Sequence, residues 1–171
     1  IINYYDKEAW EEVKALLDKA ERIARQKLGS QNPVYANILQ NTASIYLEQG
    51  DYQKAEENLL QARRIWLVLS EDARKKIADI DILIAQVDIQ NENYADAEEK
   101  LQEALRDYKK IFSKAHPDYI STKADLARLY YIMGEEKEAE KNIYFVLEAH
   151  KRFIRENFPV LSDREKAKAW D

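Results

Sequence analysis

The chain has 171 residues, of which 35% are charged and 46% hydrophobic, and its formal net charge is −5. This balance is typical of a folded globular chain, and it argues against nucleic acid as a partner because that needs a basic surface stripe. Three glycines, three prolines and no cysteine favour a nearly all-helical chain and exclude a disulfide framework or a thiolate metal site. The lack of cysteine fits a reducing compartment, and no apolar run approaches the ~20 residues of a membrane span. We therefore expect a cytoplasmic protein without a membrane partner.

The first predicted element is an amphipathic helix at residues 4–28. Its apolar side chains recur at intervals of three and four residues, which form one stripe along an α-helix. They are Trp10, Val13, Leu17, Ala20 and Ile23. The chain begins at Ile1 without Met, so we expect a piece of a longer protein that opens with half a repeat. The unpartnered apolar face of this helix predicts self-association, or coverage by the residues before it.

Turn residues divide the rest of the chain into helices. Gly29 suits a left-handed helix end, Asn32 can cap the next helix, and Pro33 suits its first position. Asp51 is a plausible N-cap in the same way. The expected helices are 34–49, 52–70, 73–91, 94–113, 117–133 and 136–157.

A Ser-x-x-Glu capping box at 162–165 predicts the start of a further short helix at 162–170. Together these elements predict one domain over 1–171, with the half repeat at 4–28 and full repeats at 34–70, 73–113 and 117–157. In each full repeat we call the first helix A and the second helix B.

The repeats are recognised by alanines and aliphatic residues at positions that return every 42 residues. Four positions of the first repeat are Ala43, Ala55, Leu59 and Ala62, which return as Ala85, Ala97, Leu101 and Ala104 and then as Ala127, Ala139, Ile143 and Val146. A fixed period of this length indicates a solenoid in which each unit packs against its neighbours. The alanines have a steric reason, because small side chains let helices A and B approach closely where they cross.

This pattern resembles the tetratricopeptide repeat, whose signature of small residue, tyrosine, alanine, leucine and alanine is met by Ala43, Tyr46, Ala55, Leu59 and Ala62. The 42-residue period, the recurring Ala-Glu pairs and a His-Pro turn before a helix are similar to the kinesin-light-chain type. The resemblance implies an all-α, right-handed superhelical solenoid of antiparallel helix pairs with a concave inner surface.

Three positions depart from the family pattern. Asp88 replaces the helix A tyrosine of the second repeat, Glu92 replaces its turn glycine, and Glu136 replaces the helix B tyrosine of the third. We expect these departures to loosen their units without disturbing the period.

A second resemblance lies at residues 158–166, which read Phe-Pro-Val-Leu-Ser-Asp-Arg-Glu-Lys. This is similar to a Phe-Pro-x-Leu-Ser-Glu-x-Glu-Lys segment that follows the repeats in bacterial proteins with a C-terminal caspase-like CHAT protease domain. The resemblance implies that the repeats are the recognition and regulatory arm of such a protein. No part of a protease lies within the 171 residues.

In the family that the repeats resemble, helix A lines the concave surface, and the spacing around Ala43 identifies the inward side chains. They are Asn37, Gln40, Ser44 and Glu48, then Asp79, Ile82, Gln86 and Gln90, then Ser121, Ala124, Arg128 and Tyr131. Side-chain amides can bond both the N–H and the C=O of an extended peptide, and a tyrosine offers a flat apolar face with one polar handle. The alternative interpretation is that these are solvated helix residues.

Nothing in the sequence predicts catalysis, a cofactor or a metal site. His116 stands before a helix start, and His150 occupies the repeat position of Trp66 and Tyr108, which favours packing between helices. No His-x-x-x-His pair or glycine-rich phosphate loop is present. The Lys/Asn cluster by which chaperone-binding relatives of the resembled family clamp a C-terminal carboxylate is also missing, which predicts no preference for acidic C-terminal tails.

The leading hypothesis is a protein-interaction module that holds a peptide or a partner helix in its groove and is not an enzyme. The alternative is a structural spacer or self-association segment without a specific ligand. Direct RNA binding is a third class, and Asp79 and Glu48 in the groove argue against it.

Overall fold

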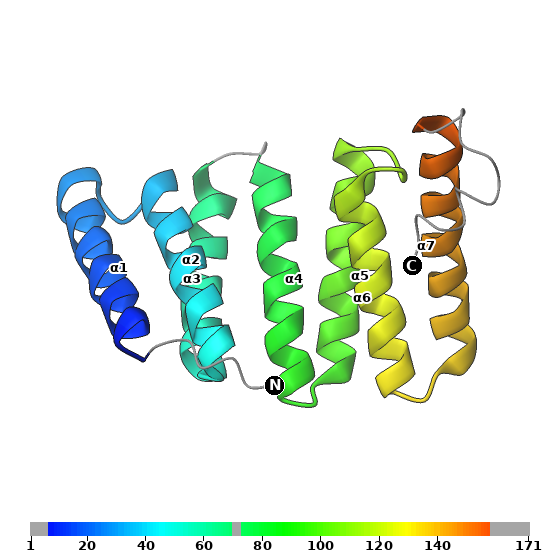
Figure 1. Ribbon diagram of the computed structural model, residues 1–171. Helices are drawn as coiled ribbons and strands as arrows, with labels where there is room; N and C mark the ends of the chain where they lie inside the picture. The colour runs from blue at the N-terminus through cyan, green and yellow to red at the C-terminus, as the bar shows by residue number, and fades with distance from the viewer. Residues whose placement is uncertain (1–6, 70–72, 158–171) are drawn as a thin grey trace. The chain divides into compact units, whose positions relative to one another are not determined.

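Seven α-helices make up the residues that the computed structural model describes, which are 7–69 and 73–157 (Figure 1). They are α1 (Lys7–Leu28), α2 (Pro33–Gln49), α3 (Tyr52–Leu69), α4 (Arg74–Gln90), α5 (Tyr94–Ile111), α6 (Pro117–Ile132) and α7 (Glu136–Asn157). No strand occurs within these ranges. The all-α prediction is confirmed, and the helix ends follow the expected turns closely; for example, the helix expected at 94–113 ends at Ile111.

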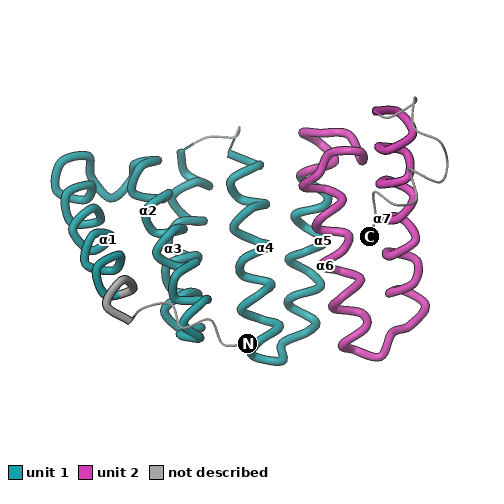
Figure 2. The backbone as a smooth tube through the Cα atoms, in the orientation of Figure 1, with its two compact units in different colours: residues 1–107 teal, residues 108–171 magenta. Residues whose placement is uncertain are grey.

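The helices fall into two compact units, residues 1–107 and residues 108–171 (Figure 2). The boundary lies within α5, near its C-terminal end. Continuity of the repeats into one domain over 1–171 stays a prediction.

Side chains cap the N-terminal ends of the helices as the sequence predicts. The Asn32 side chain accepts a hydrogen bond from the Val34 N–H at 2.8 Å, and Pro33 occupies the first turn of α2. The Asp51 carboxylate accepts from the Lys54 N–H at 3.3 Å before α3. His116 caps α6, where its Nδ1 accepts from the Asp118 N–H at 3.3 Å. Each bond satisfies one of the N–H groups that a helix start leaves without an intrahelical partner.

The turns between helix A and helix B use a left-handed residue. Gly50 and Gly134 take it with φ of 76° and 77°. Glu92 takes the same conformation in the second repeat with φ of 62°, although its side chain makes this costly. The departure noted in the sequence therefore replaces the glycine but keeps the turn.

Unit 1 has its core where α2, α3 and α4 pack together. Ala43 of α2 and Ala55 and Ala62 of α3 are fully buried in the cluster, as the small-residue crossing requires. Larger residues surround them, namely Tyr35, Leu39, Leu59, Ile65, Ile80, Ile84 and Val87. The α4 isoleucines thus close the face of the α2–α3 hairpin that its own helices leave open.

Unit 2 is built on the α6–α7 hairpin, whose helices run antiparallel (Figure 1). Leu126, Ala127 and Leu129 of α6 are buried with Ala139 of α7. The Tyr119 ring meets the edge of Phe145, with 5.8 Å between ring centroids. Before α6, the Phe112 and His116 rings stack at 3.8 Å.

Several predictions concern residues outside the described ranges. They are the N-terminal residues before Lys7 with the side chain of Trp10, the loop at 70–72, the segment at 158–166 and the short helix at 162–170. One prediction inside the described ranges is wrong. His150 is exposed rather than packed between helices, whereas its repeat equivalent Tyr108 is buried.

Candidate functional site

The predicted binding residues of unit 1 form two rows on neighbouring helices. α2 carries Asn37, Gln40, Ser44 and Glu48, and α4 carries Asp79, Ile82, Gln86 and Gln90. Residues spaced three or four apart share one face of a helix, and α2 and α4 are in contact within the unit. Most of these side chains are half-buried, and the exposed residues are at the C-terminal ends of the helices. We call these two rows the helix A face of unit 1.

Intramolecular contacts already engage three members of this face. The Ser44 hydroxyl donates to the backbone carbonyl of Gln40 at 3.2 Å, and the Asp79 carboxylate pairs with Lys75 at 3.0 Å. The Gln90 side-chain oxygen accepts from the Tyr52 hydroxyl at 3.1 Å. These groups are therefore less available to a ligand than the sequence suggests.

Three amides of the same face remain open. Within the described part of the chain, the side chains of Asn37, Gln40 and Gln86 make no hydrogen bond to protein. A half-buried amide without a protein partner can still donate and accept. These three side chains, with Ile82 beside them on α4, are the part of the face best suited to a peptide backbone.

The predicted residues of α6 belong to unit 2. Tyr131 is 75% exposed, and the Arg128 guanidinium lies 3.9 Å from the Asp125 carboxylate. Ser121 and Ala124 are exposed on the same helix. Burial raises the pKa of Asp125, while the charge of Arg128 lowers it.

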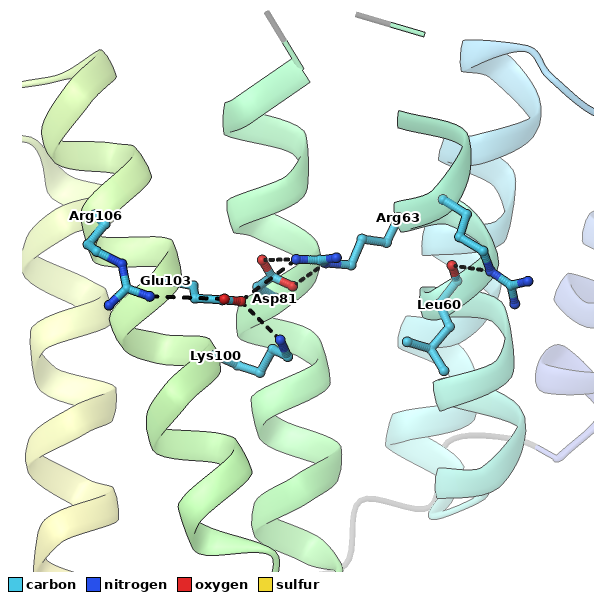
Figure 3. A network of polar contacts seen from close by, with 7 residues as sticks. Leu60, Arg63, Asp81, Lys100, Glu103 and Arg106 are labelled. Atoms are coloured by element: carbon cyan, nitrogen blue, oxygen red, sulfur yellow. Dashed lines mark hydrogen bonds and ion pairs between the residues drawn. The ribbon is translucent and has the colours of Figure 1, made fainter. Parts of the chain in front are cut away.

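A polar network that sequence reasoning missed joins α3, α4 and α5 in unit 1 (Figure 3). Asp81 is 1% exposed, and its two carboxylate oxygens accept from the Arg63 Nε at 2.6 Å and Nη2 at 3.3 Å. Arg63 also lies 3.7 Å from Glu103, which accepts from Lys100 at 2.9 Å. The only signal in the sequence was a charged residue, Asp81, at the repeat position of the core residue Leu39.

Electrostatics within this network follow from burial and from the two cations. Burial raises the pKa of the Asp81 carboxyl, and the hydrogen bond and charge of Arg63 oppose it. Burial alone would also raise the pKa of Glu103, but Lys100 and Arg63 outweigh it and lower that pKa. A buried ion pair of this kind contributes little net free energy, whereas loss of one partner is costly. We read the network as structural.

Asp88 is a second buried acid, and it stands where the first and third repeats have Tyr46 and Tyr130. The pKa of Asp88 is raised to about 6, first by burial and then by the charges of Asp96 and Glu56, while the charge of Lys100 opposes this rise. Among the described residues, none donates a hydrogen bond to this carboxylate.

Within the described ranges, no three His, Asp or Glu side chains are grouped to hold a metal ion. No helix in those ranges combines the length and the apolar character that crossing a bilayer requires.

The family follows from a match that covers most of the chain. A family model described as Tetratricopeptide repeat matches residues 2–67 and 76–144. The chain therefore belongs to the tetratricopeptide repeat family, and its fold is the helical solenoid of that family. Proteins built on this repeat mediate protein–protein interactions, and that general role applies to this chain. A comparison with curated protein sequences finds no match.

Solved structures agree on the repeat type. The chain is similar to BtubC (BKLC) from P. vanneervenii, with 16% identity, a TM-score of 0.76, and coverage of 88% of this chain and 59% of that one. It is also similar to a Podosopora anserina putative kinesin light chain with nearly identical TPR-like repeats, at 23% identity over 85% of this chain and 69% of that chain. The TM-score is 0.70 for that crystal structure and 0.72 for a second crystal structure of a single-substitution form.

The predicted resemblance to kinesin-light-chain repeats is thus confirmed at the level of fold. The chain spans about three fifths of the length of the BtubC structure, since it covers 59% of it.

Proposed function

We propose that the helix A face of unit 1 binds an extended peptide or a helix of a partner protein. The observation that carries the proposal is the set of three open amides, Asn37, Gln40 and Gln86, on two adjacent helices of one unit. Their donors and acceptors match the alternating N–H and C=O groups of a peptide backbone. Ile82 supplies an apolar contact beside them.

Hydrogen bonds alone do not account for a useful affinity. An amide bond contributes a net of about 1 kcal/mol, so three contribute about 3 kcal/mol, against about 8 kcal/mol for a micromolar complex. Apolar anchors have to supply the rest. Ile82, on the same face of unit 1, is the anchor that we propose.

A triple substitution tests this function. We expect a variant with Asn37, Gln40 and Gln86 all changed to Ala to lose capture of peptides from a displayed random-peptide library. The matched control changes Gln26, Gln31 and Gln53 to Ala, which are exposed amide side chains outside the helix A rows. Thermal unfolding shows that both variants are folded.

The alternative function is a structural spacer or self-association segment without a specific ligand. In that case the wild type enriches no peptide family, and the triple variant behaves like the control. Self-association through α1 is the form we propose for it, because Val13, Leu16 and Ile23 expose apolar surface on this helix. Concentration-dependent sedimentation tests it.

We also propose a larger context for the module. The segment at 158–166, which lies outside the described residues, supports a role in positioning or restraining a CHAT protease in the same bacterial, cytoplasmic protein. The residues that follow Asp171 in the parent gene test this directly. A His and Cys pair there supports the proposal, and a different domain overturns it.

A further inference from the structure

Lys123 of α6 is a half-buried lysine of unit 2 whose positive charge has no counter-ion. Its Nζ donates a hydrogen bond to the side-chain oxygen of Asn142 on α7 at 2.9 Å. Among the described residues, no carboxylate lies within ion-pair distance of this ammonium. Charges taken out of water are normally paired, because desolvation costs free energy. The charged form of Lys123 is therefore poorly stabilised.

The other repeats show that this position belongs to the core. The residues that stand 42 and 84 positions earlier are Asp81 and Leu39, and both are buried. The Asp81 carboxylate has the Arg63 guanidinium as its counter-ion at 2.6 Å, and a leucine needs none. The third repeat thus places a cation at a core position without the kind of counter-ion that the second repeat provides.

Asn142 is held so that its side-chain oxygen faces the lysine. This asparagine is buried, and its Nδ2 donates to the backbone carbonyl of Glu138 at 2.7 Å. An amide oxygen accepts a hydrogen bond from an ammonium and from a neutral amine, whereas a carboxylate at the same place would retain the proton. The contact therefore positions the Nζ of Lys123 without fixing its charge.

The surroundings of Lys123 favour the neutral amine. Burial is the main cause that lowers the pKa of Lys123, the charges of Lys141 and Lys114 act in the same direction, and the charge of Glu138 opposes them. Desolvation and a neighbouring cation are the two conditions that turn a lysine into a nucleophile. The place is open to a small reagent at its edge, where the Lys141 side chain is 71% exposed.

We propose that the Lys123 amine is a modification site that accepts an acyl group from a small acyl phosphate. The neutral Nζ attacks the carbonyl carbon of the donor, and the bond between that carbon and the bridging oxygen breaks. Phosphate leaves with the electron pair of that bond, and the amine proton passes to water. An anionic donor is favoured because Lys114 and Lys141 carry positive charge. The amide that forms is uncharged, and its N–H can still donate to Asn142. This inference does not rest on the proposed peptide binding.

Competitive labelling of the full chain tests the proposal. We expect acetyl phosphate at about pH 8 to label Lys123 at least about threefold more than Lys151, once each value is divided by the labelling of the same lysine in the urea-unfolded chain. Lys151 is the internal control, because its side chain is 57% exposed and its hydrogen bond to Glu148 raises its pKa. Deuterated acetic anhydride then acetylates the remaining amines of the unfolded protein, and tandem mass spectrometry gives the label ratio at each lysine.

Two asparagines at the same repeat position test the contact with Nζ. Asn142→Asp places a carboxylate against the amine and should lower the labelling of Lys123 by about threefold or more, because the ion pair retains the proton. Asn58→Asp is the matched control. Asn58 stands 84 residues earlier and likewise donates to a backbone carbonyl, that of Lys54 at 2.8 Å, but Leu39 takes the place of the lysine there. This variant should leave the labelling of Lys123 unchanged.

Lys141→Gln is a second variant should Asn142→Asp fail to fold, because Lys141 is exposed. It removes a cation near the amine and should lower the labelling of Lys123 as well. Two results would overturn the proposal. One is a normalised ratio of Lys123 to Lys151 below about threefold. The other is a ratio that neither variant lowers, because the reactivity would then not come from the contact and charges around Nζ.

Discussion

At the scale of single residues, one repeat position shows how the residue type changes the energetic cost of burying a side chain. Tyr46 and Tyr130 occupy it in the first and third repeats, and the Tyr46 ring lies 5.3 Å from the Lys54 ammonium. The second repeat has Asp88 there, which is 8% exposed and faces Glu56 from α3 and Asp96 and Lys100 from α5. A tyrosine keeps a polar handle at this place without a charge, whereas the ionised aspartate is desolvated.

Asp88 makes stability depend on pH. Its pKa rises from 3.8 to about 6 on folding, so the folded state binds the proton more tightly than the unfolded state. The stabilisation by protonated Asp88 is complete below about pH 4 and is lost as pH rises through about 6. We expect a loss of at most about 3 kcal/mol.

The control for this prediction is Asp88→Asn, which cannot ionise. Subtracting its urea-unfolding free energies from those of the wild type between about pH 4 and 8 removes the contributions of Asp81 and Asp125, whose pKa values are also raised. A difference that does not change with pH would contradict the prediction.

At the scale of elements, the helix hairpin depends on small residues where its helices cross. Ala43, Ala55, Ala62, Ala85, Ala97 and Ala104 are all fully buried. A leucine side chain cannot fit there unless the helices separate. The sequence predicted these positions correctly because a steric requirement repeats wherever the same crossing repeats.

Ala97→Leu tests the crossing. We expect it to destabilise the protein by about 1–3 kcal/mol through overpacking. Ala95→Leu on the same helix is the control, because Ala95 is exposed, and it should change the unfolding free energy by less than about 0.5 kcal/mol. Urea denaturation midpoints compare the two, and equal midpoints would show that the crossing tolerates a larger residue.

At the scale of the whole molecule, the two units carry different kinds of surface. Unit 1 has the open amides of α2 and α4, and unit 2 has the exposed Tyr131 and an apolar pocket of about 810 Å³ between α6 and α7. The open amides and the apolar pocket therefore belong to different units.

The helix A face should not prefer a free C-terminus. Its open groups are amides rather than lysines, so they lack the charge that holds a carboxylate. We expect a peptide selected from the library to bind equally well as the free acid and as the C-terminal amide, measured by isothermal titration calorimetry. Much tighter binding of the free acid would refute this.

The sequence alone determined the helices, their caps and the 42-residue repeat, because these depend on local rules of spacing and on residues such as Asn32, Asp51 and Gly50. Only the tertiary structure decided which polar side chains are free. The sequence predicted the same binding role for two sets of polar side chains. Asn37, Gln40 and Gln86 are open, whereas intramolecular hydrogen bonds or an ion pair already occupy Ser44, Asp79 and Gln90. The Arg63–Asp81 pair and the apolar pocket between α6 and α7 could not be predicted either, because each arises from side chains of different helices. Spacing along a chain predicts which face a residue lies on, but packing between helices decides what that face meets.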